Sequence, residues 1–134
     1  MRIEVFGTRS AGLGAAVRRL GCRVDRELGL KGWRVNVVFT DNRTITRLNR
    51  RFLGRNRPTD VLAFPAIGLP GAARREAVAG EVYVSRTQAR IQAAEWRVSL
   101  RSELLRLVLH GLLHLAGLEH REMADYESRF LKGL

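Results

Sequence analysis

The stretch LVLHGLLHLAGLEH, residues 107–120, decides how the rest of the chain is interpreted. Its apolar residues predict a helix that buries one face in a core. His110 and His114 are four residues apart, so on a helix they share a face with Cβ atoms ~5–6 Å apart. Gly117 can adopt the left-handed conformation that ends a helix, and the following turn would bring His120 back toward the other two histidines.

Three histidines in this arrangement predict a metal site. Two imidazoles on one helix face can converge on an ion at Zn–N distances of ~2.0–2.1 Å, and three protein ligands leave the open position of a catalytic site. A histidine on an apolar helix is often only a satisfied core residue, but the chain's only three histidines all fall in this segment. We therefore expect one Zn²⁺ per chain, or another divalent transition metal, bound by His110, His114 and His120, with His114 also acting in catalysis.

The spacing is similar to the zinc-peptidase motif HExxHxxGxxH, with one chemical difference. The peptidase places its general-base glutamate directly after the first histidine, and here that residue is Gly111. The missing carboxylate makes a peptidase less favoured without excluding it. Glu119, beside His120, has two interpretations: it orients a ligand imidazole, or it is a solvated carboxylate in a turn.

Outward from this segment, hydrophobic periodicity predicts strands interspersed with helices. Strands are expected at 2–6, 33–40, 61–65 and 81–85. Helices are expected at about 10–28, after Asp41, at 86–96, from Ser99 onward and at about 122–131. Residues 53–60 and 66–79 are expected to be loops, the second exposed and mobile. This order predicts an α/β layered fold (an α+β sandwich), in which a small mixed four-stranded sheet packs with helices and one helix carries the H-x3-H pair.

The composition is that of a globular domain with a large excess of positive charge. A chain of 134 residues is expected to form a single domain, residues 1–134. Its net charge of +11 favours a polyanionic partner, although nearly all the cations are arginines and such a bias can reflect genome composition. We recognise neither a signal peptide nor an apolar run of ~18 residues, and expect a cytoplasmic protein without membrane contact. Cys22, Trp33 and Trp96 are expected to pack in the core.

Two further blocks accompany the histidine segment HGLLHLAGLEH. They are LNRRFLGRNRPTDVLAFP, residues 48–65, and GEVYVS, residues 80–85. In this order the three blocks resemble the YbeY family of bacterial metal-dependent endoribonucleases. The corresponding family signatures are N-x-x-[YF]-R-G-x-x-x-P-T-D-V-L-S-F-P, G-D-[IV]-x-[IV]-[SC] and H-G-x-L-H-L-x-G-x-D-H.

The resemblance implies a cytoplasmic enzyme that matures the ends of ribosomal RNA, notably the small-subunit 3′ end, and takes part in ribosome quality control. It implies single-stranded RNA as substrate, ribosomal or small-subunit proteins as partners, and one metal, usually zinc, on the three histidines. Two departures from the family are mild, since Glu81 and Glu119 stand where the family has aspartate. The third concerns activity, because Leu53 replaces an arginine that the family uses.

The resulting hypothesis is metal-assisted hydrolysis of an RNA phosphodiester by a metal-bound water, with substrate held by the 50–57 loop and the residues after it. The substrate-binding candidates are Arg51, Arg55, Arg57, Thr59 and Asp60, of which Arg51 and Arg55 are also catalytic candidates. The arginines are alternatively a solvated basic face, and Asp60 a cap for local backbone donors. The sequence identifies no general base. A zinc metallopeptidase-like hydrolase and a non-catalytic ribosome-assembly factor with a metal site remain as alternatives.

Overall fold

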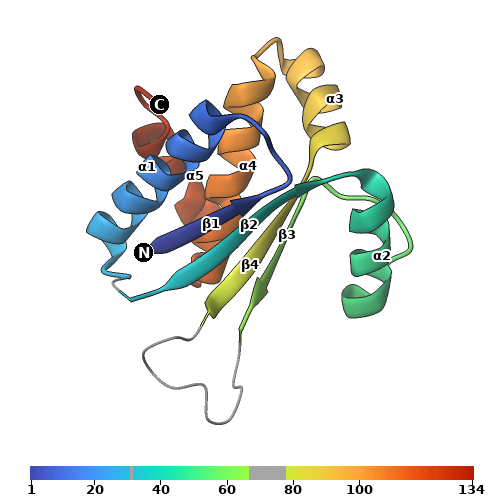
Figure 1. Cartoon of the computed structure of the whole chain (residues 1–134), viewed down its shortest axis with the longest axis horizontal. Coiled ribbons are helices and arrows are strands. Elements are labelled where there is room, and N and C mark those ends of the chain that lie inside the picture. Colours follow the sequence, from blue (N-terminus) through green and yellow to red (C-terminus); the bar gives the residue numbers. More distant parts are fainter. Residues whose placement is uncertain (31, 67–77) are drawn as a thin grey trace.

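The computed structural model describes residues 1–30, 32–66 and 78–134 of the chain. Its elements follow in the order β1 (Arg2–Phe6), α1 (Ala11–Leu28), β2 (Arg34–Thr40), α2 (Asn42–Leu53), β3 (Val61–Pro65), β4 (Val78–Ser85), α3 (Arg86–Trp96), α4 (Leu100–Leu115) and α5 (His120–Phe130) (Figure 1).

The strands form one mixed sheet in the order β1-β2-β4-β3. β1, β2 and β4 run parallel, and β3 pairs antiparallel with β4 at the edge. Parallel neighbours require a crossover connection, and α1 supplies it between β1 and β2. The predicted α/β fold with a small mixed four-stranded sheet is therefore confirmed.

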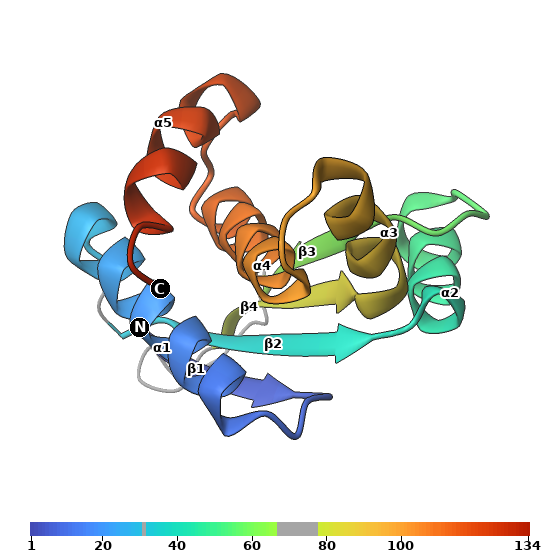
Figure 2. The same ribbon diagram turned by 90° about the horizontal axis from the view of Figure 1, so that it is seen from above.

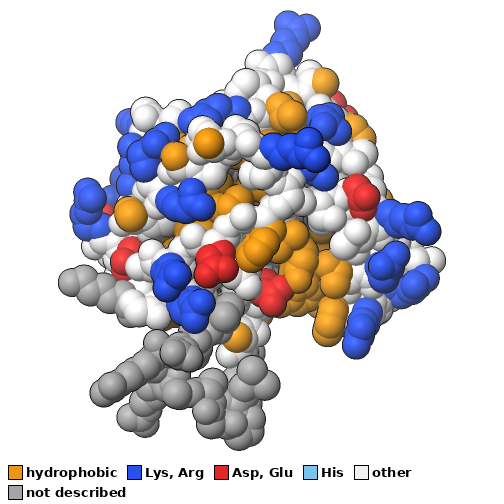
Figure 3. All heavy atoms as spheres, in the orientation of Figure 1, with side chains coloured by type: hydrophobic (Ala, Val, Ile, Leu, Met, Phe, Trp, Pro, Cys, Tyr) orange, Lys and Arg blue, Asp and Glu red, His pale blue; other side chains and the backbone are white. Residues whose placement is uncertain are grey.

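The helices α1 and α4 lie side by side on one face of the sheet, and α5 packs outside them (Figure 2). Burial alternates along β2, where Val35, Val37 and Phe39 point into the core. The core consists mainly of aliphatic side chains contributed by α1, the sheet and α4, among them Val17, Leu20, Val24, Val37, Val84, Leu109 and Leu113. Lysine and arginine side chains are spread around the face of the molecule seen in Figure 3, as the net charge of +11 leads one to expect.

Helix α4 approaches the sheet at two glycines, one on each partner. A Cβ added at Gly111 would lie 2.5 Å from Val82 Cγ1, and one added at Gly80 would lie 2.5 Å from Leu115 Cδ2. Nonbonded carbon atoms in folded proteins essentially never come this close, so a larger residue at either position would force its neighbour or the helix to shift. Gly111 is therefore a packing residue, and a glutamate at this position would have to enter the helix–sheet interface.

Local capping explains where the last two helices begin. Ser99 caps α4, because its hydroxyl accepts a hydrogen bond from the N–H of Ser102 at 3.0 Å. Helix α5 starts at His120, two residues earlier than predicted, because Glu119 and Glu122 form a reciprocal capping box. The third histidine is thus the first residue of a helix and has a fixed backbone.

Two of the three core predictions for minor residues are wrong. Cys22 is exposed, because Gly21 and Val24 occupy the buried face of α1 and position 22 points to solvent. Trp96 is 53% exposed at the end of α3, where the Arg106 guanidinium lies over its ring at 4.9 Å. Trp33 is partly buried against the core as predicted.

The connection predicted over residues 66–79 falls mostly on 67–77, which lie outside the described residues, and its last two residues belong to β4. Within the part of the chain that is described, helices are either too short or too polar to cross a lipid bilayer.

Replacing Gly111 by alanine tests the close contact between α4 and β4. We expect Gly111→Ala to lower the free energy of unfolding by about 1–3 kcal/mol through overpacking, even though alanine is the better helix former. Chemical denaturation monitored by circular dichroism measures the change.

Gly12 provides the matched control, since it is also a helical glycine but a Cβ there would meet only Ser10 Oγ, at 3.9 Å. Gly12→Ala should leave stability unchanged or raise it by up to about 1 kcal/mol. Equal stability changes in the two variants would contradict a special role for Gly111.

Candidate metal centre

The three histidines predicted as metal ligands come together on one side of α4. Each offers a ring nitrogen, and these nitrogens all lie within 4.8 Å of one another. The Nε2 atoms of His110 and His114 are 3.0 Å apart. Two nitrogens bound tetrahedrally to one ion at ~2.0–2.1 Å are separated by ~3.3 Å, so this pair fits a single ion.

Two helices position these candidate ligands. His110 and His114 lie one turn apart in the last two turns of α4, which the Gly111–Val82 contact holds against the sheet. Gly117 takes a positive φ of 82°, the left-handed conformation predicted for it, and reverses the chain between α4 and α5. The ring centroids of His110 and His120 are consequently 5.5 Å apart.

A carboxylate behind His110 sets which ring nitrogen faces the cluster. Glu127 Oε1 lies 3.4 Å from His110 Nδ1, and both side chains are mostly buried, with exposed fractions of 24% and 21%. A hydrogen bond from Nδ1–H to this carboxylate leaves Nε2 unprotonated and directed at the other histidines. Glu127 thereby favours the tautomer that can bind a metal.

The protonation of His114 also favours metal binding. Burial lowers the pKa of His114, and the neighbouring His110 and His120 lower it further by electrostatic repulsion of a second charge. The neutral imidazole that a metal requires is therefore the prevailing form of His114 at neutral pH.

The position of Glu119 does not match the orienting role that the sequence suggested for it. Its carboxylate is largely exposed and lies 3.5 Å from Arg121 Nε, and it also takes part in the capping box of α5. Among the two interpretations, the structure favours the solvated turn carboxylate. The carboxylate that contacts a candidate ligand histidine is that of Glu127.

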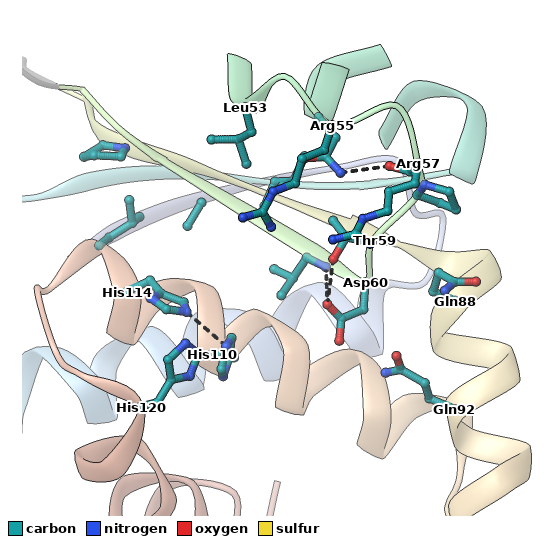
Figure 4. A pocket seen from close by; sticks show the side chains of 17 residues that line it. Leu53, Arg55, Arg57, Thr59, Asp60, Gln88, Gln92, His110, His114 and His120 are labelled. Carbon is teal, nitrogen blue, oxygen red and sulfur yellow. Dashed lines mark hydrogen bonds between the residues drawn. The ribbon is translucent and has the colours of Figure 1, made fainter. Parts of the chain in front are cut away.

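The histidines open onto a cavity of about 850 Å³. Its wall combines the start of α5, the end of α4, β3, the α2–β3 loop and one side of α3 (Figure 4). Its polar lining residues are Asn49, Arg55, Arg57, Thr59, Asp60, Gln88, Gln92 and the three histidines. Asp60 is the one acidic residue among the described residues of this lining.

The α2–β3 loop is held over the cavity by hydrogen bonds at both ends. Asn49, a buried residue of α2, donates from Nδ2 to the carbonyl of Arg57 at 2.8 Å. Asp60 accepts the N–H of Val61 on Oδ1 at 2.8 Å, and its own carbonyl accepts the N–H of Ser85 at 2.8 Å. The local capping role considered for Asp60 is thus present, and it coexists with a place in the cavity wall.

The predicted substrate-binding arginines divide into two groups. Arg55 and Arg57 line the cavity, and Figure 4 shows both side chains extending over it from the loop. Arg51 does not belong to the lining, and its guanidinium lies over the Phe52 ring at 5.4 Å. Leu53 also faces the cavity and is 52% exposed, so the position at which the family carries arginine is at the site.

A buried ionic network joins α3 to α4 beside the cavity. The Glu103 carboxylate is 1% exposed and accepts hydrogen bonds from Gln92 Nε2 at 2.9 Å and from Arg106 Nε at 2.5 Å. Burial lowers the pKa of Arg106, but Glu103, Glu127 and Asp60 together raise it above its ordinary value. Because both charges are paired, the network fixes α3 relative to the histidine helix without leaving an unsatisfied charge.

A three-histidine cluster with room for a further ligand, set in a cavity lined by arginines, is typical of metal-dependent hydrolases that act on phosphate esters. Comparison with known proteins agrees. The family model described as Endoribonuclease YbeY matches residues 11–132, and the chain belongs to the YbeY family.

Individual relatives support this membership. The chain is 40% identical over 94 residues to Endoribonuclease YbeY of Sulfurihydrogenibium sp., covering 70% of this chain and 60% of that protein. It is 34% identical over 112 residues to Endoribonuclease YbeY of Persephonella marina, covering 84% and 72%. The solution structure of TM1509 from Thermotoga maritima superimposes with a TM-score of 0.64 at 30% identity, covering 97% of this chain and 87% of that one.

Four polar residues of the site were not singled out from the sequence. Glu127 follows His120 by seven residues, and this two-turn spacing on one helix face is the signal that could have found it. Asn49 opens the second sequence block, but its contact with the Arg57 carbonyl depends on the loop conformation. Gln88 and Gln92 carry no local signal, because only the packing of α3 places them in the cavity wall.

The contrast between Glu127 and Glu119 is testable by metal affinity. We expect Glu127→Gln to weaken zinc binding about tenfold, because the orienting carboxylate behind His110 loses its charge. Competition with a chromophoric chelator measures the affinity and requires no enzymatic activity.

Glu119→Gln is the matched control, since it makes the same chemical change on an exposed carboxylate beside His120. This variant should retain the zinc affinity of the original chain. A loss confined to Glu119→Gln would reverse the assignment of the orienting carboxylate.

Proposed function

We propose that this chain is a metal-dependent endoribonuclease that cleaves single-stranded ribosomal RNA during maturation of the small-subunit 3′ end and in ribosome quality control. The observation that carries the proposal is the joint placement of the three histidines, Arg55 and Arg57 in one cavity. The relatives named as endoribonucleases support an RNA substrate. A net charge of +11 suits a polyanionic partner.

His110, His114 and His120 hold the ion in this proposal, and zinc fits the all-nitrogen ligand set. When bound, the ion supplies a Lewis acid for the phosphodiester and lowers the pKa of water. Glu127 keeps the His110 tautomer fixed during turnover.

The cavity wall provides the remaining chemistry. Arg55 and Arg57 bind the scissile phosphate and stabilise the charge that develops on it, since guanidinium groups match phosphate geometry. Asp60 uses Oδ1 for the Val61 N–H. As the acidic residue of the described cavity lining, Asp60 would take the proton of the attacking nucleophile on its second oxygen. Thr59 lies beside it and shapes the wall. Arg51, whose guanidinium lies over the Phe52 ring, has no catalytic role in this proposal.

A peptidase is disfavoured by the role of Gly111. The peptidase general base would occupy this position, and the contact with Val82 leaves no space for any side chain there. The ribosome and its small-subunit proteins are the proposed partners, with the cytoplasm as the place of action.

Parallel assays on RNA and protein substrates test the function. The zinc-loaded chain and its His114→Ala variant are incubated with ribosomal RNA and with casein, with and without chelator. We expect cleavage of RNA only, abolished by chelator and reduced at least 100-fold in His114→Ala, because one of three ligands is lost.

Casein cleavage would instead establish a peptidase. If neither substrate is cut while chelator still lowers the melting temperature, the chain is a non-catalytic factor stabilised by its metal.

The leucine that replaces the family arginine offers a gain-of-function test. We expect Leu53→Arg to raise RNA affinity at low salt and to steepen its dependence on salt concentration by about one unit, because one more guanidinium would face the cavity. Fluorescence anisotropy with a single-stranded oligonucleotide at several salt concentrations measures both quantities.

Ile91→Arg provides the control, since Ile91 is similarly exposed at 49% but does not line the cavity. It should change the affinity less than Leu53→Arg does. Equal effects of the two substitutions would mean that the cavity position has no special contact with RNA.

A further inference from the structure

Two glutamines of α3 line the cavity beyond the histidines, and the proposed hydrolysis uses neither. Gln88 and Gln92 are one helical turn apart, half-buried, and the only glutamines in the chain. In the view of Figure 4, Asp60 lies between them and the histidine cluster. The same cavity therefore has the histidines in one part of its wall and the two glutamines in another.

The amide of Gln92 has a fixed orientation. Its Nε2 donates to Glu103 Oε2 at 2.9 Å, and the Glu103 carboxylate also receives the Arg106 guanidinium. An ionised carboxylate only accepts hydrogen bonds, so the group that faces it must be the NH₂ of Gln92. The Gln92 carbonyl oxygen is left as an acceptor without a protein partner among the described residues.

The amide of Gln88 is oriented the opposite way by a chain of three contacts. The buried Ser85 hydroxyl accepts the backbone N–H of Gln88 at 3.1 Å and donates its own proton to Asn42 Oδ1 at 2.6 Å. Asn42 directs its Nδ2 to Gln88, whose Oε1 accepts at 3.3 Å. The NH₂ group of Gln88 is thus left as a donor that no described residue uses.

We propose that Gln88 and Gln92 form a base-binding subsite, in which the Gln88 donor and the Gln92 acceptor hold the hydrogen-bonding edge of one RNA nucleobase. This inference rests on the proposed function and extends it to nucleobase recognition next to the cleaved bond.

The chemistry of the pair favours a base over a phosphate. A phosphate only accepts hydrogen bonds, so the Gln92 oxygen would repel it. A nucleobase edge carries donors and acceptors side by side, and glutamine amides recognise such edges through both groups at once. Because Glu103 holds the Gln92 amide and Asn42 holds the Gln88 amide, the subsite loses little side-chain freedom when it binds.

Nucleoside monophosphates and ribose 5-phosphate separate base binding from binding of sugar and phosphate. We expect at least one of AMP, CMP, GMP and UMP to bind the zinc-loaded chain about tenfold more tightly than ribose 5-phosphate, in line with one donor–acceptor pair. Titration of the ¹⁵N-labelled protein by NMR measures the affinities. The side-chain NH₂ signals of the two glutamines should shift with the nucleotide and not with ribose 5-phosphate.

Gln88→Glu should remove the preference for the nucleotide, because it keeps the acceptor for Asn42 and turns the donor that faces the cavity into an acceptor. Gln92→Met removes the acceptor and should have the same effect. Ala94→Glu is the control for added charge, since Ala94 is exposed on α3 and does not line the cavity. It should retain the preference.

Equal affinities of all four nucleotides and ribose 5-phosphate for the original chain would overturn the proposal. A nucleotide preference that survives in Gln88→Glu, with an unchanged melting temperature, would overturn it as well. Neither result depends on RNA cleavage, so a chain that fails to cut RNA can still show base-dependent binding, and one that cuts RNA can lack it.

Discussion

The close contact between α4 and β4 is the constraint on which the site depends. Gly111 and Gly80 let the histidine helix and the sheet approach until Val82 and Leu115 fill the interface. This contact sets the distance between α4 and the sheet, and therefore the position of His110 and His114 in the cavity wall. The Gly117 turn places His120 relative to this helix, and the Glu103 network does the same for α3. The α2–β3 loop is fixed separately, by Asn49 of α2.

A second feature is that a few carboxylates fix the helices and one histidine ring in this strongly basic chain. Glu103 is buried with two partners and joins α3 to α4, while Glu127 directs the His110 ring. A buried carboxylate that lost its partners would cost several kcal/mol, so these contacts favour one arrangement of the helices over looser ones. No ion pair among the described residues involves Arg55 or Arg57, so both cavity arginines stay available for a polyanion.

Prediction from the sequence succeeded where the determining interactions are local. The His110–His114 pair, the left-handed Gly117 and the start of a helix at Ser99 each depend on spacing within a single helix or turn. It failed for Trp96 and Cys22, where an apolar residue at the edge of a periodic pattern points to solvent. Glu119 was considered for an orienting role because it neighbours His120 in sequence, yet a neighbour along the chain points elsewhere once α5 begins, and Glu127 makes that contact two turns later.

The sequence by itself determined the fold class, the family and the choice of the three histidines as candidate metal ligands. Hydrophobic periodicity and ligand spacing are encoded within short segments. Only the tertiary structure decided which charged and polar groups meet at the cavity. It placed Arg55 and Arg57, but not Arg51, in the cavity lining, and it brought Gln88 and Gln92 into the same wall. It also put Glu127, and not Glu119, next to His110. The physical reason is that these contacts join segments far apart along the chain, and they form only after α3, α4 and the α2–β3 loop have packed on the same sheet. Gly111 illustrates both contributions. The sequence shows its place in the motif, but only the structure shows that Val82, on a strand 29 positions earlier, leaves no room for a side chain there.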